Sequence, residues 1–202
     1  MTKDDIFQNL LQATQNAYRA NLQMQAFAGF PSDVAQQPVM PHHCNCRDVF
    51  QGDSKLNSNR YAELQDAILA AGDVAHWRET YKGTEISDDF MDRFGCYCII
   101  GEEAPFFSHS LRLWMVYMPA GLYYPWHHHP AEEMYMVVSG SAVFKRKGFP
   151  DEILSEGQTS FHTSNQSHAM ETRDDPILCL VAWRDSFHAP PELTREPSLA
   201  SA

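Results

Sequence analysis

The 202-residue sequence lacks long apolar runs and lacks an excess of positive charge. No segment approaches the roughly 20 apolar residues that a membrane-spanning helix needs. Lysine and arginine number 15 against 26 aspartate and glutamate residues, so the net charge is −11, and the longest basic run is Lys145–Lys147. Such a chain repels nucleic acid and anionic membranes. We therefore expect neither a nucleic acid nor a membrane as its partner.

A secretory signal is also missing, because the charged start, Met1 to Asp5, is not followed by an apolar segment. The five cysteines are an odd number. We therefore expect mostly reduced thiols in a cytoplasmic protein. What the sequence does contain is 44% apolar residues, enough for the packed core of one domain with a helical extension.

The first 95 residues have the pattern of helices and loops. Apolar residues spaced three and four apart predict one helix over residues 4–28. They are Ile6, Leu10, Ala13, Ala17, Ala20, Met24 and Phe27. Prolines at positions 31, 38 and 41 then break the chain. Ser58 is expected to cap a second helix that ends near Gly72, and Ser87 a short third helix that stops at Gly95.

After residue 95 the pattern changes to short strands, rich in β-branched and aromatic residues and separated by Gly, Pro, Asp and Ser. The runs are LRLWMVYM (111–118), MYMVVSG (134–140), SAVFK (141–145), TSF (159–161) and ILCLVAW (177–183). Strands without intervening helices predict a sandwich or a small barrel. The sequence thus predicts a mainly β fold, in which a helical extension (residues 1–95) packs on a β-barrel (residues 96–202).

Metal-binding residue types gather in the stretch YYPWHHHPAEEMY, residues 123–135. His127 and His129 are two apart, so on an extended backbone they point to the same face. Glu133 follows four residues later, and a separate segment supplies His168. Three imidazoles and a carboxylate suit one divalent transition metal (Fe²⁺, Zn²⁺ or Mn²⁺, with Co²⁺ or Ni²⁺ also suitable) and leave positions open for a substrate.

The alternative is that these residues are structural or exposed, as a single histidine in a strand usually is. The combined spacing favours the metal site. His128 lies between two proposed ligands and should point away from it, and Glu132 should face solvent or support the site from behind. His109 and His162 are further candidates for the rim or the surroundings of the site.

A second cluster of ligand types, HHCNC at residues 42–46, has a different explanation. Its Cys-x-Cys spacing, repeated at Cys96 and Cys98, is shorter than the Cys-x2–4-Cys spacing usual for zinc. We therefore expect incidental reduced cysteines rather than a four-thiol zinc site.

Two segments resemble the two motifs of the cupin superfamily. The first reads Gly121-x5-His127-x-His129-x3-Glu133-x6-Gly140, and the second reads Gly157-x5-Thr163-x-Asn165-x2-His168. The second motif usually has proline where Thr163 stands and glycine where Asn165 stands, and these departures affect turn geometry rather than ligation. The resemblance implies a small antiparallel jelly-roll barrel with the metal inside.

The stretch from Tyr124 to Tyr135 carries a more specific resemblance. It reads YPWHHHPAEEMY and resembles the signature of the cupin-type dimethylsulfoniopropionate (DMSP) lyases, the DddQ/DddL-like group, which also have a helical N-terminal part. The match covers the β half well and the N-terminal half only in length and character. It implies a carbon–sulfur lyase (dimethylpropiothetin dethiomethylase) that converts DMSP into dimethyl sulfide and acrylate by β-elimination.

The resemblance also implies roles for three aromatic residues near the metal that binds the substrate carboxylate. Tyr135, two residues after Glu133, is the expected base, because a neighbouring cation lowers the tyrosine pKa from about 10. Tyr124 is expected to be a second catalytic residue that hydrogen-bonds the carboxylate, and Trp183 to offer an aromatic face to the sulfonium. Each of the three could instead serve packing alone.

Two other functions would use the same ligands. An Fe(II) cupin dioxygenase would consume O₂ and would not need Tyr135. A non-catalytic cupin that binds a small acid would show no turnover. Both a monomer and a homodimer are compatible with the sequence.

Overall fold

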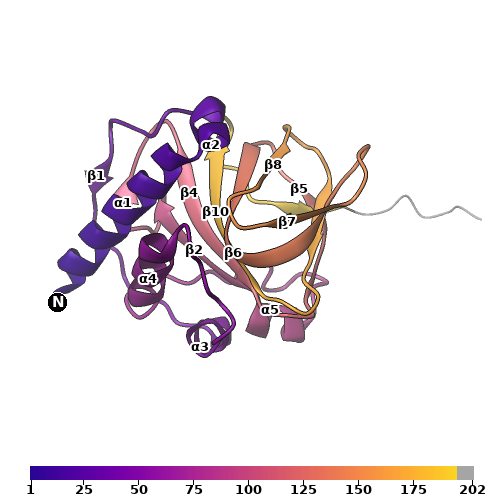
Figure 1. Ribbon diagram of the computed structural model, residues 1–202, viewed down its shortest axis with the longest axis horizontal. Coiled ribbons are helices and arrows are strands. Elements are labelled where there is room, and N and C mark those ends of the chain that lie inside the picture. Colours follow the sequence, from indigo (N-terminus) through magenta and orange to yellow (C-terminus); the bar gives the residue numbers. More distant parts are fainter. Residues whose placement is uncertain (195–202) are drawn as a thin grey trace, which may run out of the picture.

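The helices precede the main strands in the computed structural model, which describes residues 1–194 (Figure 1). The helices are α1 Lys3–Ala20, α2 Leu22–Phe27, α3 Asn45–Gln51, α4 Ala62–Ala71 and α5 Asp88–Arg93. The strands are β1 Ala35–Gln36, β2 Gly95–Ile100, β3 Phe106–Phe107, β4 Arg112–Met118, β5 Tyr123–His128, β6 Glu132–Arg146, β7 Glu152–Ser155, β8 Thr159–His162, β9 His168–Glu171, β10 Ile177–Arg184 and β11 Glu192–Leu193. The expected mainly β fold with a helical N-terminal part is confirmed. Residues 195–202 of the predicted β part lie outside the described residues.

The barrel is built around the long strand β6, which belongs to two sheets. Its first half pairs antiparallel with β10 and β8, and its second half with β7 and β9. Gly140, between the halves, has a φ of +77°, and a Cβ there would collide with the Pro176 carbonyl. The two runs expected as separate strands, 134–140 and 141–145, are therefore one strand that bends at Gly140.

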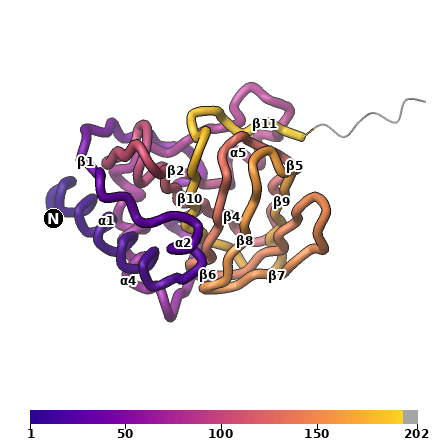
Figure 2. Tube along the Cα trace, turned by 90° about the horizontal axis from the view of Figure 1, so that it is seen from above, coloured from indigo at the N-terminus to yellow at the C-terminus, as the bar shows by residue number. Residues whose placement is uncertain are grey.

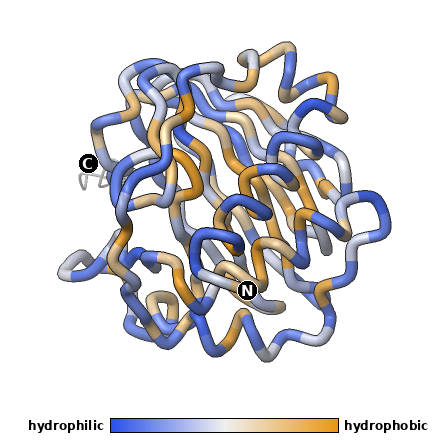
Figure 3. The backbone as a smooth tube through the Cα atoms, turned by 90° about the vertical axis from the view of Figure 1, so that its left-hand side faces the viewer, coloured by the Kyte–Doolittle hydropathy of each residue, from blue (hydrophilic) through white to orange (hydrophobic). Residues whose placement is uncertain are grey.

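The sheet around β4, β6 and β10 is buried on both faces. Figures 1 and 2 show α1, α2 and α4 on one side of it, with strands β5, β7, β8 and β9 curving away on the other. Alternate residues of each strand therefore enter different cores: Met115 packs toward the helices, whereas Trp114 and Val116 face the barrel interior. Burial on both faces explains why the strand sequences are almost continuously apolar. Figure 3 shows this contrast, with long orange stretches in the strands behind helices whose turns alternate between blue and orange.

The helix predicted for residues 4–28 is wrong in one respect, because it breaks at Asn21. The Asn21 side chain accepts hydrogen bonds from the backbone N–H groups of Gln23 and Met24, and so caps α2. Its amide also donates to the Gly157 carbonyl, at 3.0 Å. Asparagine favours such a capping position over a helix interior. This one side chain therefore ends α1, begins α2 and ties both to the barrel.

The other helices differ from expectation mainly at their ends. The Ser87 hydroxyl accepts a hydrogen bond from the Phe90 N–H, so the predicted cap of α5 is confirmed. The Ser58 hydroxyl accepts from the Tyr61 N–H in a turn that precedes α4, and the helix itself starts at Ala62. Helix α3 was not expected in the predicted helical part, and strands β2, β5, β7 and β9 were not among the runs expected in the β part. No helix within residues 1–194 has both the length and the apolar character needed to cross a membrane.

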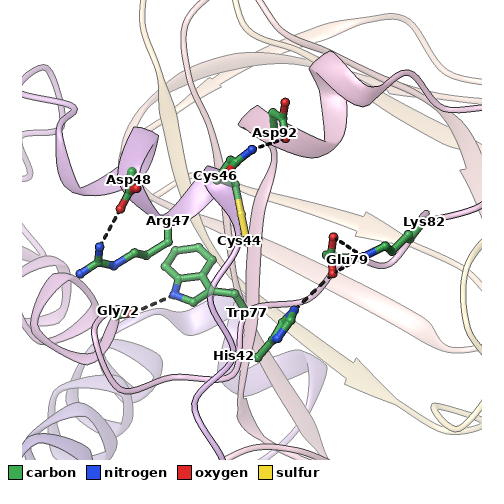
Figure 4. Close-up of a disulfide and its surroundings, with 11 residues drawn as sticks. His42, Cys44, Cys46, Arg47, Asp48, Gly72, Trp77, Glu79, Lys82 and Asp92 are labelled. Atoms are coloured by element: carbon green, nitrogen blue, oxygen red, sulfur yellow. Dashed lines mark hydrogen bonds and ion pairs between the residues drawn. A yellow bond between two sulfur atoms is a disulfide. The ribbon is translucent and has the colours of Figure 1, made fainter.

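The prediction of incidental reduced cysteines is wrong for Cys44 and Cys46, which form a disulfide at the start of α3 (Figure 4). The chain turns there from an extended residue into the helix, which brings the two Cα atoms to 5.4 Å. That separation suits a disulfide. The other three cysteines, Cys96, Cys98 and Cys179, are buried free thiols. Because two of its four sulfur atoms are bonded to each other, the four-thiol zinc site does not form.

Candidate active site

Strand pairing gathers the predicted ligands inside the barrel. His127 on β5 lies directly across from His168 on β9. Glu133 on β6 has Trp183 of β10 on one side and His162 of β8 on the other. All of these side chains are buried. Residues 129–131, with Pro130 at their centre, lie between β5 and β6 and separate His127 from Glu133 along the chain.

The Glu133 carboxylate is the centre of this cluster. Its Oε2 atom lies 2.7 Å from His162 Nδ1, 3.1 Å from His168 Nε2 and 3.5 Å from His129 Nε2. Its Oε1 atom accepts a hydrogen bond of 2.6 Å from the indole N–H of Trp183. One ligand atom from each of His129, Glu133 and His168 lies within 4.8 Å of the others.

His127 stands at the edge of that group. Its ring centroid is 4.1 Å from that of His168 but 6.4 Å from that of His129. The structure thus brings three of the four predicted ligands into one tight group and places the fourth against it. The four-residue ligand set stays a prediction.

The protonation pattern of the three histidines fits a metal. The Nδ1 atoms of His127, His129 and His168 lie 2.8, 3.0 and 2.8 Å from backbone carbonyls, which only accept hydrogen bonds. Each Nδ1 therefore carries the proton, and each Nε2 presents a lone pair. Within the described residues, Nε2 of His129 and of His168 is buried without a hydrogen-bond partner. A cation coordinated by both nitrogens and by Glu133 would satisfy them.

Electrostatics keeps Glu133 ionised. Burial disfavours its charged form, but the imidazoles of His129 and His168 outweigh that effect and hold the pKa of Glu133 well below its usual range. Burial likewise disfavours the charged form of His129, but the Glu133 carboxylate raises the pKa of this imidazole. For His127, burial and then the neighbouring His168 lower the pKa well below its usual value. A divalent cation in place of a proton on His129 would therefore meet one ionised carboxylate and imidazole nitrogens, the donor set that such a metal takes.

A cavity of about 140 Å³ lies against this cluster, and all three predicted aromatic residues line it. Tyr135 is 4% exposed, and burial, followed by the Glu133 carboxylate, raises its pKa well above the usual value. The ring of Tyr124 stacks on His127 at 4.0 Å, and its hydroxyl lies 2.5 Å from the hydroxyl of Tyr81. Trp183 lies 4.3 Å from the His129 ring.

The secondary candidates divide between the site and the surface. His162 is buried beside Glu133, and its Nε2 lies 3.0 Å from the Ser160 hydroxyl. His128 points away toward Thr194, at 3.0 Å, as expected. Glu132 pairs with Arg184 at 2.7 Å. His109 is exposed, packs against Phe107 and does not line the cavity.

Several residues in and behind the cavity wall were missed from the sequence. Tyr81 lies behind the wall, where it contacts Tyr124 from 43 positions away, and no local pattern marks it. Arg78, Arg112 and Trp114 line the cavity itself. Arg112 and Trp114 have the inward parity of the strand LRLWMVYM, and this parity was the one signal that could have found them.

Most of this chain matches the sequence model of a known protein family. The model of the family described as dimethylsulfoniopropionate lyase matches residues 15–179. The chain belongs to this family. The expectation of an enzyme, a lyase of the cupin type, is thereby confirmed at the level of the family.

Individual DMSP lyases match over nearly their whole length. The chain is 44% identical to the dimethylsulfoniopropionate lyase DddQ of Ruegeria pomeroyi over 191 residues, which are 95% of each protein. The crystal structure of that DddQ superposes with a TM-score of 0.93, covering 95% of this chain and 97% of that one. A second structure, whose description names the DMSP lyases RdDddP and RnDddQII, is 36% identical with a TM-score of 0.92 and coverage of 96% of this chain and 100% of that one. The helical part of this chain is thus a shared feature of these DMSP lyases, and the expected cupin fold is confirmed.

Proposed function

We propose that this chain is a metal-dependent DMSP lyase, which eliminates dimethyl sulfide from DMSP and releases acrylate. One observation carries the proposal: in a member of the DMSP lyase family, the buried cluster of His129, Glu133 and His168 adjoins the cavity that Tyr135 lines. The substrate is small and zwitterionic, in keeping with a cavity of about 140 Å³. We also propose a cytoplasmic monomer or homodimer, a location in keeping with the three buried free thiols.

His129, Glu133, His168 and the adjacent His127 would hold one divalent ion, Fe²⁺, Zn²⁺ or Mn²⁺, with Co²⁺ or Ni²⁺ as alternatives. A bound divalent cation would supply positive charge to the substrate carboxylate and to the Tyr135 hydroxyl. Support for this ligand set comes from the outward-facing Nδ1 protons and the unpaired, buried Nε2 atoms. Three neutral imidazoles and one carboxylate leave coordination positions for the substrate.

Tyr135 is the proposed base. As a phenolate it takes the proton from the carbon next to the carboxylate, and that C–H electron pair becomes the new carbon–carbon double bond. The bond between the other carbon and sulfur breaks, and its electron pair leaves with neutral dimethyl sulfide. Because burial and Glu133 raise the pKa of Tyr135, the proposed base depends on compensating positive charge beside it.

Tyr124 and Trp183 are the proposed substrate-binding residues. The Tyr124 hydroxyl is held against Tyr81, which orients it for a hydrogen bond to the substrate carboxylate. The Trp183 ring offers a π face to the sulfonium, which has no hydrogen-bonding group. Its N–H has a second task, since it fixes one oxygen of Glu133.

The test is headspace gas chromatography of purified protein incubated with DMSP, with and without a chelator. We expect dimethyl sulfide from protein loaded with Fe²⁺, Mn²⁺ or Zn²⁺, and its loss on chelation. No dimethyl sulfide from protein loaded with each metal in turn would refute the lyase proposal. Measurement of O₂ uptake in the same samples separates a dioxygenase from a lyase.

A further inference from the structure

Two arginines line the cavity away from the histidine cluster. Arg112 begins β4 and lies across from Trp183, which in turn lies across from Glu133. Two strand spacings of about 4.8 Å place the Arg112 backbone roughly 10 Å from that of Glu133. Arg78 reaches the same part of the cavity from the segment before β2. Among the described residues that line the cavity, these two are the ones with a permanent positive charge.

The arginines are held in place by the indole of Trp114. The Arg78 guanidinium carbon is 4.9 Å from the Trp114 ring centroid, and that of Arg112 is 5.7 Å from it. Phe187 contacts Arg112 from another side, at 5.3 Å. Contacts with aromatic faces leave the edges of a guanidinium, where its N–H groups lie, open to other partners. Aromatic contacts thus fix the faces of both guanidinium groups, and Nη2 of Arg78 also donates to the Glu102 carbonyl, at 3.3 Å.

Some hydrogen-bond donors of Arg78, Arg112 and Trp114 have no acceptor. Within residues 1–194, the Nε atoms of Arg78 and Arg112 and the Nε1 atom of Trp114 are buried and have no hydrogen-bond acceptor. Arg112 is 6% exposed, so its guanidinium is largely removed from water. Three unpaired N–H groups on adjoining cavity-wall residues form an environment that favours an acceptor with negative charge.

The contacts already made show which acceptor suits the group. Arg112 binds the Glu102 carboxylate at 3.1 Å, and Arg78 binds the Glu103 carboxylate at 3.1 Å. Both acids lie on the turn after β2, and their side chains are 57% and 55% exposed. Only the acid side of each pair is exposed, so water screens the carboxylates and favours their exchange for another carboxylate. Glu102 therefore occupies the mouth of the cavity as an exchangeable partner of Arg112.

We propose that Arg78 and Arg112 form a carboxylate-binding site at the cavity mouth, separate from the histidine cluster, which accepts short monocarboxylates in exchange for Glu102. The protein has a net charge of −11 and therefore repels anions overall. The two arginines would attract an anion locally as it enters or leaves the cavity. It does not suit a sulfonium, which the two guanidinium groups repel. The identity of the natural ligands rests on the proposed lyase function. With that function, the site binds the carboxylate of the incoming substrate and of the departing acrylate.

The test is calorimetric titration of propionate into the metal-loaded full-length protein and into the same protein after chelation. Propionate carries the carboxylate without the sulfonium, and neutral propionamide is its matched control. We expect propionate binding that survives chelation, and no binding of propionamide. Arg112→Gln should weaken propionate binding to the chelated protein by about tenfold or more. Arg173→Gln, which removes an exposed arginine outside the cavity wall, should bind like the unaltered protein.

A second variant keeps the test decisive if Arg112→Gln does not fold. Glu102→Gln leaves both arginines in place and removes the competing carboxylate, so propionate should bind about threefold more tightly. Propionate binding that disappears on chelation, or that is unchanged in both variants, would overturn the proposal. The titration needs no turnover, so it stands or fails independently of dimethyl sulfide release.

Discussion

The Glu133 carboxylate is held by four side chains: His162, His168 and Trp183 come from three strands, and His129 comes from the turn after β5. Trp183 donates to one oxygen, and the imidazoles surround the other. A carboxylate fixed in this way has little rotational freedom left, so it meets a cation already oriented. Trp183 and His162 are therefore positioning residues for the proposed metal ligand.

The first prediction at the residue scale concerns Tyr135. Tyr135→Phe should retain bound metal and lower kcat/KM for DMSP by about 10² to 10⁴-fold, because only the hydroxyl that removes the proton is lost. Metal content by elemental analysis and dimethyl sulfide release measure the two effects. Tyr123→Phe alters an exposed tyrosine outside the cavity wall and is the control. Near-normal turnover in Tyr135→Phe would rule out this base.

A second residue-scale prediction concerns His162, which touches Glu133 and does not line the cavity. His162→Gln should weaken metal binding by about 10 to 100-fold, because Glu133 loses the imidazole that orients it. Competition with a chromophoric chelator measures the metal dissociation constant without reference to turnover. His109→Gln, at an exposed histidine, should leave that constant unchanged. Equal metal dissociation constants for His162→Gln and His109→Gln would refute the role of His162 in positioning Glu133.

The buried His162 should also make the free energy of unfolding of the metal-free protein decrease as the pH falls. Burial and the neighbouring His168 lower the pKa of His162 to about 3. As the pH falls below the unfolded value of about 6.5, the unfolded chain takes up a proton that folded His162 refuses until about pH 3. The stability present above pH 6.5 is therefore lost between these limits.

Urea unfolding at several pH values measures this loss. Removing the titrating group in His162→Gln should reduce the slope of unfolding free energy against pH, by up to about 1.4 kcal/mol per pH unit. Slopes that coincide in variant and unaltered protein would show that His162 takes up its proton in the folded state as well.

At the scale of elements, the bend in β6 depends on one glycine. Gly140 has a φ of +77°, and a Cβ there would meet the Pro176 carbonyl, which precedes β10. The bend carries one strand from the sheet that holds Glu133 into the sheet that holds His168. The backbone at Gly140 thus helps to close the barrel around the site.

Gly140→Ala should lower the free energy of unfolding by about 3 kcal/mol or more, because left-handed strain and a backbone clash add. Gly148→Ala is the matched control, since its φ is +90° and no atom lies within 4 Å of the added Cβ. It should cost only about 1–2 kcal/mol, the strain alone. Urea unfolding curves compare the two variants, and equal losses would show that the clash with Pro176 is relieved by a shift of the chain.

At the scale of the whole molecule, the helices and the barrel share one apolar core. Leu10 and Met24 of the helical part pack in the same cluster as Met115 of β4 and Met136 of β6. Asn21 adds a polar tie to Gly157. The helices and the sheet bury their facing apolar surfaces against each other, and neither part buries its surface alone. The division of the chain into a helical extension (residues 1–95) and a barrel (residues 96–202) stays a prediction.

The shared core predicts a single cooperative unfolding transition. Differential scanning calorimetry should give a calorimetric enthalpy equal to the van't Hoff enthalpy, because separating the helices from the sheet exposes both of their apolar faces. Truncation of residues 1–28 should cause aggregation, since it uncovers the outer face of the sheet. Two resolved transitions, or a soluble folded truncation, would contradict the shared core.

The sequence by itself determined the features that depend on neighbours along the chain. The spacing of the candidate ligands His127, His129 and Glu133, the Ser87 cap of α5 and the apolar runs of β4 and β10 all follow local rules of backbone direction and side-chain parity. The same rules read β6 as two strands, because a strand bent between two sheets has no local signature.

Only the tertiary structure decided what lies around the ligands. His162 meets Glu133 across 29 positions, Trp183 across 50, and Tyr81 meets Tyr124 across 43. Such contacts depend on strand register and on how the sheets close, which are set by the packing of the whole chain rather than by any segment of it. Spacing within a segment identified the residues that could bind a metal, whereas long-range pairing determined which side chains orient them and where two arginines enter the cavity wall.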